Sequence, residues 1–155
     1  MLISRDNIRE LVDKLHKDGK TVVTTNGCFD ILHVGHVRYL EKTKTFADVL
    51  IVLLNSDKSV RSIKGESRPI NPESDRAEIL SALRCVDYVV LFDEDSPRNL
   101  IDEMKPDVYT KGADYTLETL PEADIMKKNN IKVEFIDFVE GKSTTRIIKE
   151  VNKCL

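Results

Sequence analysis

The fold is indicated most clearly by residues 21–36, which have the sequence Thr-Val-Val-Thr-Thr-Asn-Gly-Cys-Phe-Asp-Ile-Leu-His-Val-Gly-His. Residues 21–25 are rich in β-branched side chains and predict a buried strand. A helical pattern begins at about residue 35 and runs to about residue 45. A strand that passes through a short loop into a helix is the repeating unit of a parallel α/β sheet.

The same alternation continues along the chain, with further strands predicted at 49–54, 88–92, 108–110 and 131–135. We therefore expect an α/β fold, a Rossmann-like parallel five-stranded sheet with helices on both faces. It would form a single domain over residues 1–155, with an N-terminal helix in 1–19 preceding the core. Residues 55–71 are expected to form a polar loop.

Composition excludes several classes of protein. The 155 residues are 41% hydrophobic and 33% charged, with a net charge of -3, so a general nucleic-acid binder is not expected. The three cysteines are far apart and do not suggest a disulfide framework or zinc site. The start of the chain lacks the apolar block of a signal peptide, and no run approaches the roughly 18 apolar residues of a spanning helix. We expect a cytoplasmic protein that does not bind membranes.

His33 and His36 stand on either side of Gly35, after the first strand and at the start of a helix. A helix N-terminus presents free N–H groups and positive potential, and imidazoles can donate hydrogen bonds to phosphate oxygens. Gly35 would let a phosphate approach the backbone closely. The position after a strand favours a phosphate site over two alternatives, which are zinc ligation and incidental surface histidines.

The segment Gly27 to His36 resembles the signature of the cytidylyltransferase-like nucleotidyltransferases, with its His-x-Gly-His core. Gly141-Lys142-Ser143-Thr144-Thr145 resembles the second signature of that family, and the likeness spans about residues 21–151. Within this superfamily the chain is most similar to the adenylyltransferase domain of the bacterial ADP-heptose synthesis enzymes. The resemblance rests on residues 61–72, Asp75-Arg76, Asn55-Ser56-Asp57 and Lys111 to Tyr115.

The resemblance implies transfer of AMP from ATP to D-glycero-β-D-manno-heptose 1-phosphate, which gives ADP-heptose and pyrophosphate for lipopolysaccharide or another surface glycan. The glycerol-3-phosphate cytidylyltransferases have an arginine where this chain has Phe138, which disfavours cytidine specificity. Two alternatives stay open. One is a CTP-dependent enzyme resembling those cytidylyltransferases, and the other is a non-catalytic nucleotide-binding regulatory protein.

The resemblance also implies roles for individual residues. His33, His36 and Lys44 would be catalytic, and Lys44 falls on roughly the same helix face as His36. The nucleotide would be bound by Gly27, Cys28, Phe29, Asp30, Gly35, Arg76, Lys111, Gly112, Ser143, Thr144 and Thr145, and the sugar phosphate by Lys64, Arg68 and Asp114. Cys28 has no evident base partner, so it is interpreted as packing and not as a nucleophile.

Magnesium would accompany the triphosphate and be held by phosphate oxygens and water, with no direct protein ligand expected. Asp30 is the residue that would either contact the ion or orient the loop. Simpler interpretations stay open for several residues. Ser143 to Thr145 could be a plain helix cap, Lys44, Lys64 and Arg68 could be solvated cations, and Asp114 could be a turn residue.

The family likeness suggests a homodimer. A chain of 155 residues has no room for the sugar kinase that is fused to this domain in some bacteria. A separate heptose kinase is therefore expected upstream, supplying the sugar 1-phosphate.

Overall fold

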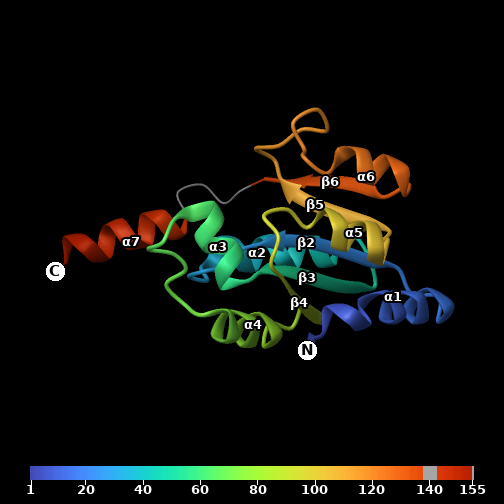
Figure 1. Ribbon diagram of the computed structural model, residues 1–155, viewed down its shortest axis with the longest axis horizontal. Helices are drawn as coiled ribbons and strands as arrows, with labels where there is room; N and C mark the ends of the chain where they lie inside the picture. Colours follow the sequence, from blue (N-terminus) through green and yellow to red (C-terminus); the bar gives the residue numbers. More distant parts are fainter. Residues whose placement is uncertain (138–142, 155) are drawn as a thin grey trace.

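In the part of the chain that the structure describes, the sheet contains six parallel strands in the order β1-β4-β3-β2-β5-β6. Strands β2 to β6 are labelled in Figure 1. The computed structural model describes residues 1–137 and 143–154. The strands are β1 (Leu2–Ile3), β2 (Val22–Gly27), β3 (Val49–Asn55), β4 (Tyr88–Phe92), β5 (Val108–Gly112) and β6 (Lys132–Ile136). The prediction of a parallel sheet is therefore confirmed, but the prediction of five strands is wrong.

The additional strand, β1, lies at the edge of the sheet and pairs with β4, with Leu2 opposite Val89 and Ile3 opposite Val90. Two residues are too few to show an alternating pattern, so the sequence carried no signal for this strand. After it, a 3-10 turn at Arg5–Asn7 leads into α1 (Ile8–Lys17). The N-terminal segment thus adds a strand to the sheet edge, and Ile8 and Val12 of α1 belong to the buried core.

Helices cover both faces of the sheet, as predicted. The remaining helices are α2 (Val34–Lys44), α3 (Asp57–Lys64), α4 (Glu73–Ser81), α5 (Arg98–Met104), α6 (Ala123–Lys128) and α7 (Thr144–Lys153). One core cluster joins α1, α5 and α6 to alternate strand residues such as Ile51 and Leu53. The other joins α2 and α4 to Leu50, Val52 and Leu54. Neighbouring residues of β3 therefore point to opposite faces, and both faces are buried.

The segment 55–71 is not a continuous loop, because it contains α3. Ser56 caps this helix by accepting a hydrogen bond from the Ser59 backbone N–H at 3.2 Å. Val60 is its buried apolar residue, while Ile63 is exposed. An eight-residue helix with so little apolar surface is hard to distinguish from a polar loop by periodicity.

The course of the chain places a crevice at the carboxyl end of β2. The chain runs from β2 to β3 and β4 on one side, and β5 and β6 then lie on the other side of β2. Such a reversal leaves an opening beyond the strand ends, which is where α/β sheets bind ligands. Across the described ranges, no helix is both long and apolar enough to pass through a membrane.

Candidate active site

A cleft at the carboxyl ends of β2 and β5 has two adjoining halves. Both are lined by residues 26–29, His36, Lys111, Tyr115 and Thr144. The half beside α2 has a volume of about 440 Å³ and is completed by His33, Gly35, Tyr39, Gly112, Asp114 and Ser143. The half beside α3 has a volume of about 400 Å³ and is completed by Asp30, Asn55, Ile63, Lys64, Arg68, Asp95 and Thr145. We call these the α2 half and the α3 half.

The loop after β2 turns back on itself at Phe29, whose φ of 44° lies in the left-handed region. This turn brings the Phe29 ring over Gly27. A Cβ at position 27 would lie 2.9 Å from Phe29 Cε2, closer than real Cβ contacts allow. Any larger residue at position 27 would therefore force the Phe29 ring to move, which favours glycine there. The Phe29 ring in turn makes an edge contact with His36, with the ring centroids 5.3 Å apart.

His33 and His36 are held by a reciprocal cap at the start of α2. His33 Nδ1 accepts from the Gly35 N–H at 3.1 Å, and His36 Nδ1 accepts from the His33 N–H at 3.4 Å. Because Nδ1 is an acceptor in both neutral rings, the ring proton lies on Nε2. Each Nε2 is therefore a donor that the helix end does not use. The Gly35 N–H donates within this cap and is therefore not available to a ligand.

Burial lowers the pKa of His36 to about 4, and the neighbouring His33 acts in the same direction. An imidazole with that pKa is neutral at pH 7. A neutral His36 can donate its Nε2 proton in a hydrogen bond, and an anionic ligand in the cleft would favour its charged form. The geometry thus fits the predicted role of a charge stabiliser for phosphate oxygens.

Asp30 is 2% exposed, and its hydrogen bonds connect the β2–α2 loop to the segment after α3. Its Oδ1 accepts from the Ile70 and Asn71 N–H groups at 2.8 and 2.9 Å, and its Oδ2 accepts from Arg68 Nε at 2.5 Å. Burial raises the pKa of Asp30, but these hydrogen bonds outweigh it and hold the pKa below its usual range. Of the two roles predicted for Asp30, the contacts show the one that orients the loop.

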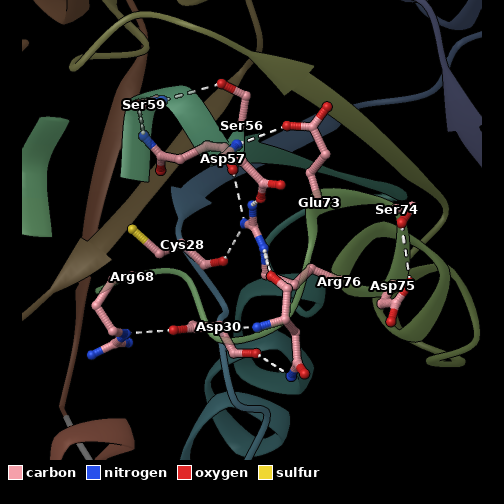
Figure 2. Close-up of polar contacts among 12 residues, drawn as sticks. Cys28, Asp30, Ser56, Asp57, Ser59, Arg68, Glu73, Ser74, Asp75 and Arg76 are labelled. Carbon is pink, nitrogen blue, oxygen red and sulfur yellow. Dashed lines mark hydrogen bonds and ion pairs between the residues drawn. The ribbon is translucent and has the colours of Figure 1, made fainter. Parts of the chain in front are cut away.

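Arg76 does not line the cleft, so the structure does not bring it to the phosphate site predicted for it. Its side chain is 0% exposed, and Figure 2 shows it enclosed between the loop and α3. The guanidinium donates to the carbonyl oxygens of Asn71, Cys28 and Asn55 at 3.0, 2.7 and 2.8 Å. It also donates to Asp57 Oδ1 at 2.7 Å. Four of its five N–H groups therefore donate to other groups of the protein. Through its bond to the Cys28 carbonyl, Arg76 holds the loop after β2 in place.

The structure does not bring Lys44, which was predicted to be catalytic, to the cleft. Lys44 lies at the far end of α2, where its Nζ donates to the Asp87 carboxylate and to the Asp48 carbonyl. Asp48 and Asp87 directly precede β3 and β4, at the amino edge of the sheet. The eight residues between His36 and Lys44 correspond to about 12 Å along a helix. Sharing a helix face was therefore not enough to bring Lys44 to the cleft.

The described part of the second signature, Ser143 to Thr145, lies beside the first signature. Ser143 caps α7, since its Oγ accepts from the Arg146 N–H at 3.1 Å. Thr144 Oγ1 donates to the Ile31 carbonyl at 3.2 Å and so ties α7 to the histidine loop. Ser143 and Thr144 line the α2 half, and Thr144 and Thr145 line the α3 half. Phe138, Gly141 and Lys142 lie outside the described residues.

The remaining predicted residues divide between the two halves. Lys64 and Arg68 both line the α3 half, whereas Asp114 lines the α2 half, so the three residues predicted for the sugar phosphate do not share one pocket. Gly112 lines the α2 half. Cys28 borders both, and burial raises the pKa of its thiol above the usual range, which suits packing and not nucleophilic attack.

The lining residues that sequence reasoning missed include Asn26, Tyr39, Asn55, Ile63 and Asp95. Asn26 and Asn55 lie at the carboxyl ends of β2 and β3, so a polar residue closing a buried strand was a usable signal. Tyr39 lies on the inner face of α2, where an aromatic residue looks like ordinary core. Within residues 1–137 and 143–154, no group of three or more histidine, cysteine or acidic side chains could hold a metal ion.

Comparison with known proteins agrees with this geometry. The chain belongs to the cytidylyltransferase-like family, whose model matches residues 24–150. The matched region includes both lining signatures, and membership places the chain among the nucleotidyltransferases.

The chain is similar to the bifunctional protein HldE of several bacteria. It is 52% identical to HldE of Syntrophotalea carbinolica, over 95% of this chain and 30% of the relative. It is 57% identical to HldE of Campylobacter concisus, over 94% of this chain and 30% of the relative. The chain thus spans about a third of the length of these curated relatives.

Two solved structures share the fold. The lipopolysaccharide core biosynthesis protein of Thermoplasma volcanium has a TM-score of 0.63 and 32% identity, over 80% of this chain and all of that chain. The pantoate-beta-alanine ligase of Francisella tularensis, complexed with β,γ ATP and β-alanine, has a TM-score of 0.63 and 16% identity. It covers 99% of this chain and 77% of that chain, and it supports the fold alone.

Proposed function

We propose that this nucleotidyltransferase transfers AMP from ATP to D-glycero-β-D-manno-heptose 1-phosphate, which forms ADP-heptose and pyrophosphate. The proposal is carried by the convergence of the histidine pair and the Ser143–Thr144 cap on one cleft that also holds Lys64 and Arg68. The heptose acceptor is supported by the resemblance of the residue 61–72 segment and by the likeness to a lipopolysaccharide core biosynthesis protein. The similarity to bifunctional HldE proteins agrees with this choice.

The reaction needs little from the protein beyond binding and charge stabilisation. A phosphate oxygen of the acceptor attacks the α-phosphorus, the bond from that phosphorus to the β-phosphate oxygen breaks, and pyrophosphate leaves. A phosphate monoester has a second pKa of about 6, so it is largely ionised at pH 7 and needs no general base. In-line positioning and stabilisation of developing negative charge are then the main contributions.

The two halves of the cleft suit the two substrates. The α2 half offers the imidazole donors of His33 and His36 at the start of α2, which fit the triphosphate of ATP. The α3 half offers Lys64 and Arg68, which fit the phosphate of the sugar. ATP would enter as its magnesium complex, with the ion on phosphate oxygens and water. A homodimer, an upstream heptose kinase and a cytoplasmic location belong to the same proposal.

A pyrophosphate-release assay tests the proposal. ATP and CTP are each combined with heptose 1-phosphate and with glycerol 3-phosphate, and we expect rapid release with ATP and heptose 1-phosphate. Faster release with CTP and glycerol 3-phosphate would favour the cytidylyltransferase alternative. Nucleotide binding without release in any combination would favour a regulatory protein.

A further inference from the structure

Lys111 occupies the junction between the two halves of the cleft. It lies near the end of β5, next to the end of β2, and its side chain borders both halves. The other cations of the site belong to one half each, since Lys64 and Arg68 line the α3 half. Among the described residues that border both halves, Lys111 is the one lysine or arginine. A group bound in either half would therefore reach it.

The Lys111 ammonium is held by neutral groups. Its Nζ donates to Asn26 Oδ1 at 2.9 Å and to Tyr109 Oη at 3.3 Å. It also lies 5.2 Å from the Tyr115 ring centroid and 5.8 Å from that of Tyr109, within the range of cation–π attraction. An ammonium has three N–H donors, so one is left for a further acceptor. Across the described ranges, no carboxylate lies within ion-pair distance of it.

The position of the Lys111 ammonium is fixed by Asn26 and the buried Tyr109. Tyr109 is 0% exposed, and its hydroxyl donates to the same Asn26 Oδ1 at 2.7 Å. Asn26 thus accepts from both Tyr109 and Lys111. Burial lowers the pKa of Lys111, and Glu122 and Asp114 oppose the shift from a distance. A half-buried cation without a paired anion is costly, and a bound phosphate would offset that cost.

The two other buried or partly buried cations near the cleft each have a carboxylate partner. Arg68 is paired with Asp30, and Arg76 is paired with Asp57. Their charge is largely balanced by the protein before any ligand binds. Lys111 keeps its charge available for a ligand at the point where the two halves meet.

We propose that Lys111 is a catalytic residue that contacts both reacting phosphates, and that Asn26 positions it. This inference rests on the proposed function. As the acceptor oxygen bonds to the α-phosphorus and the electron pair of the breaking bond leaves with pyrophosphate, negative charge gathers on the α-phosphate oxygens. Lys111 stabilises that charge and reduces the repulsion between the two anions. It stays protonated throughout, and no proton is transferred.

The variants Lys111→Met and Lys111→Arg test the catalytic role, with Lys127→Met at an exposed position of α6 as the matched control. We expect Lys111→Met to lower kcat by at least about 100-fold, the scale of losing one transition-state donor. Its KM for ATP should change less than about threefold, since ground-state binding is shared with other groups. Its Tm should be equal to or above that of the unchanged protein, because a poorly compensated charge is removed. Lys111→Arg should recover part of kcat, and Lys127→Met should match the unchanged protein.

Asn26→Asp tests the positioning role without changing the shape of the side chain. A carboxylate 2.9 Å from Nζ would form an internal ion pair that balances the positive charge of Lys111. We expect kcat to fall by roughly 10-fold or more while Tm holds or rises. A merely structural role for Asn26 predicts the opposite pattern, with Tm falling and kcat per folded molecule retained.

Three outcomes would overturn the inference. One is a kcat of Lys111→Met within about threefold of the unchanged protein. Another is a raised KM for one substrate with kcat retained, which would make Lys111 a binding residue. The third is a loss of activity that only matches a loss of folded protein by circular dichroism. If the unchanged protein releases no pyrophosphate with any acceptor, the proposed function fails first, and the inference fails with it.

Discussion

The imidazole rings of His33 and His36 stack on one another, with centroids 3.8 Å apart and an angle of 23° between the ring planes. Two charged imidazoles would repel each other strongly at this distance, so the stacked arrangement disfavours charging both rings at once. The reciprocal cap at the start of α2 fixes both rings with Nε2 as the donor. The pair is therefore prepared to donate hydrogen bonds to an anion and not to remove a proton from a nucleophile.

Replacing His36 by alanine should lower kcat by at least about 100-fold, because a preorganised donor to the reacting phosphates is lost. Pyrophosphate release at saturating ATP and acceptor measures this. His16→Ala is the control, because His16 lies on α1 and pairs with Asp107, away from the cleft. An undiminished kcat in His36→Ala would remove this residue from the mechanism.

Acid should destabilise the protein partly through His36. Its pKa is about 4 in the folded protein and about 6.5 when the chain is unfolded. Between these values the unfolded chain binds more protons, so the free energy of unfolding falls as the pH falls from about 6.5 to about 4. Urea denaturation at pH 7 and pH 4.5 should show a smaller loss in His36→Gln than in the unchanged protein. Equal losses in the two proteins would contradict the assigned pKa.

Lys44→Met should leave the KM for ATP and kcat unchanged, because Lys44 lies at the opposite edge of the sheet. It should lower the free energy of unfolding by about 1 kcal/mol, through loss of a partly exposed ion pair with Asp87. Steady-state kinetics and urea denaturation separate the two effects. A several-fold rise in the KM for ATP would return Lys44 to the phosphate site.

Arg76→Gln should be strongly destabilising, by about 3 kcal/mol, since it leaves Asp57 and three carbonyl oxygens without their donor. Activity should fall through disorder of the loop, with both kcat and KM affected. Arg84→Gln is a suitable control, because Arg84 is an exposed arginine just beyond α4. If Arg76→Gln kept its stability and lost ATP affinity alone, the phosphate role first predicted for Arg76 would be restored.

The sequence was sufficient to predict the parallel sheet, the helices on both faces and the position of the histidine pair. These follow from long apolar strands such as Val49–Asn55 and from a motif that directly follows a strand. The edge strand Leu2–Ile3 and the short helix Asp57–Lys64 were missed because each is too short for a periodic pattern. Their formation depends on pairing with β4 and on the Ser56 cap, which are contacts made in the folded chain.

The charged residues were harder to assign than the elements. Lys44, Lys64, Arg68 and Arg76 are all cations near family motifs, and the sequence does not say whether a cation is paired inside the protein. The structure shows Arg76 enclosed by carbonyl oxygens and Lys44 bound to Asp87, whereas Lys64 borders the cleft. Burial and ion pairing decide which cation is available to a phosphate, and both depend on residues distant in sequence.

The most direct test of nucleotidyl transfer follows the acceptor phosphate by ³¹P NMR. Heptose 1-phosphate labelled with ¹⁸O in its phosphate is incubated with ATP and magnesium. Attack of this phosphate on the α-phosphorus predicts ADP-heptose that keeps all of the label, together with unlabelled pyrophosphate. Label in the pyrophosphate, formation of AMP in place of a nucleotide sugar, or no turnover of the labelled acceptor would contradict the account.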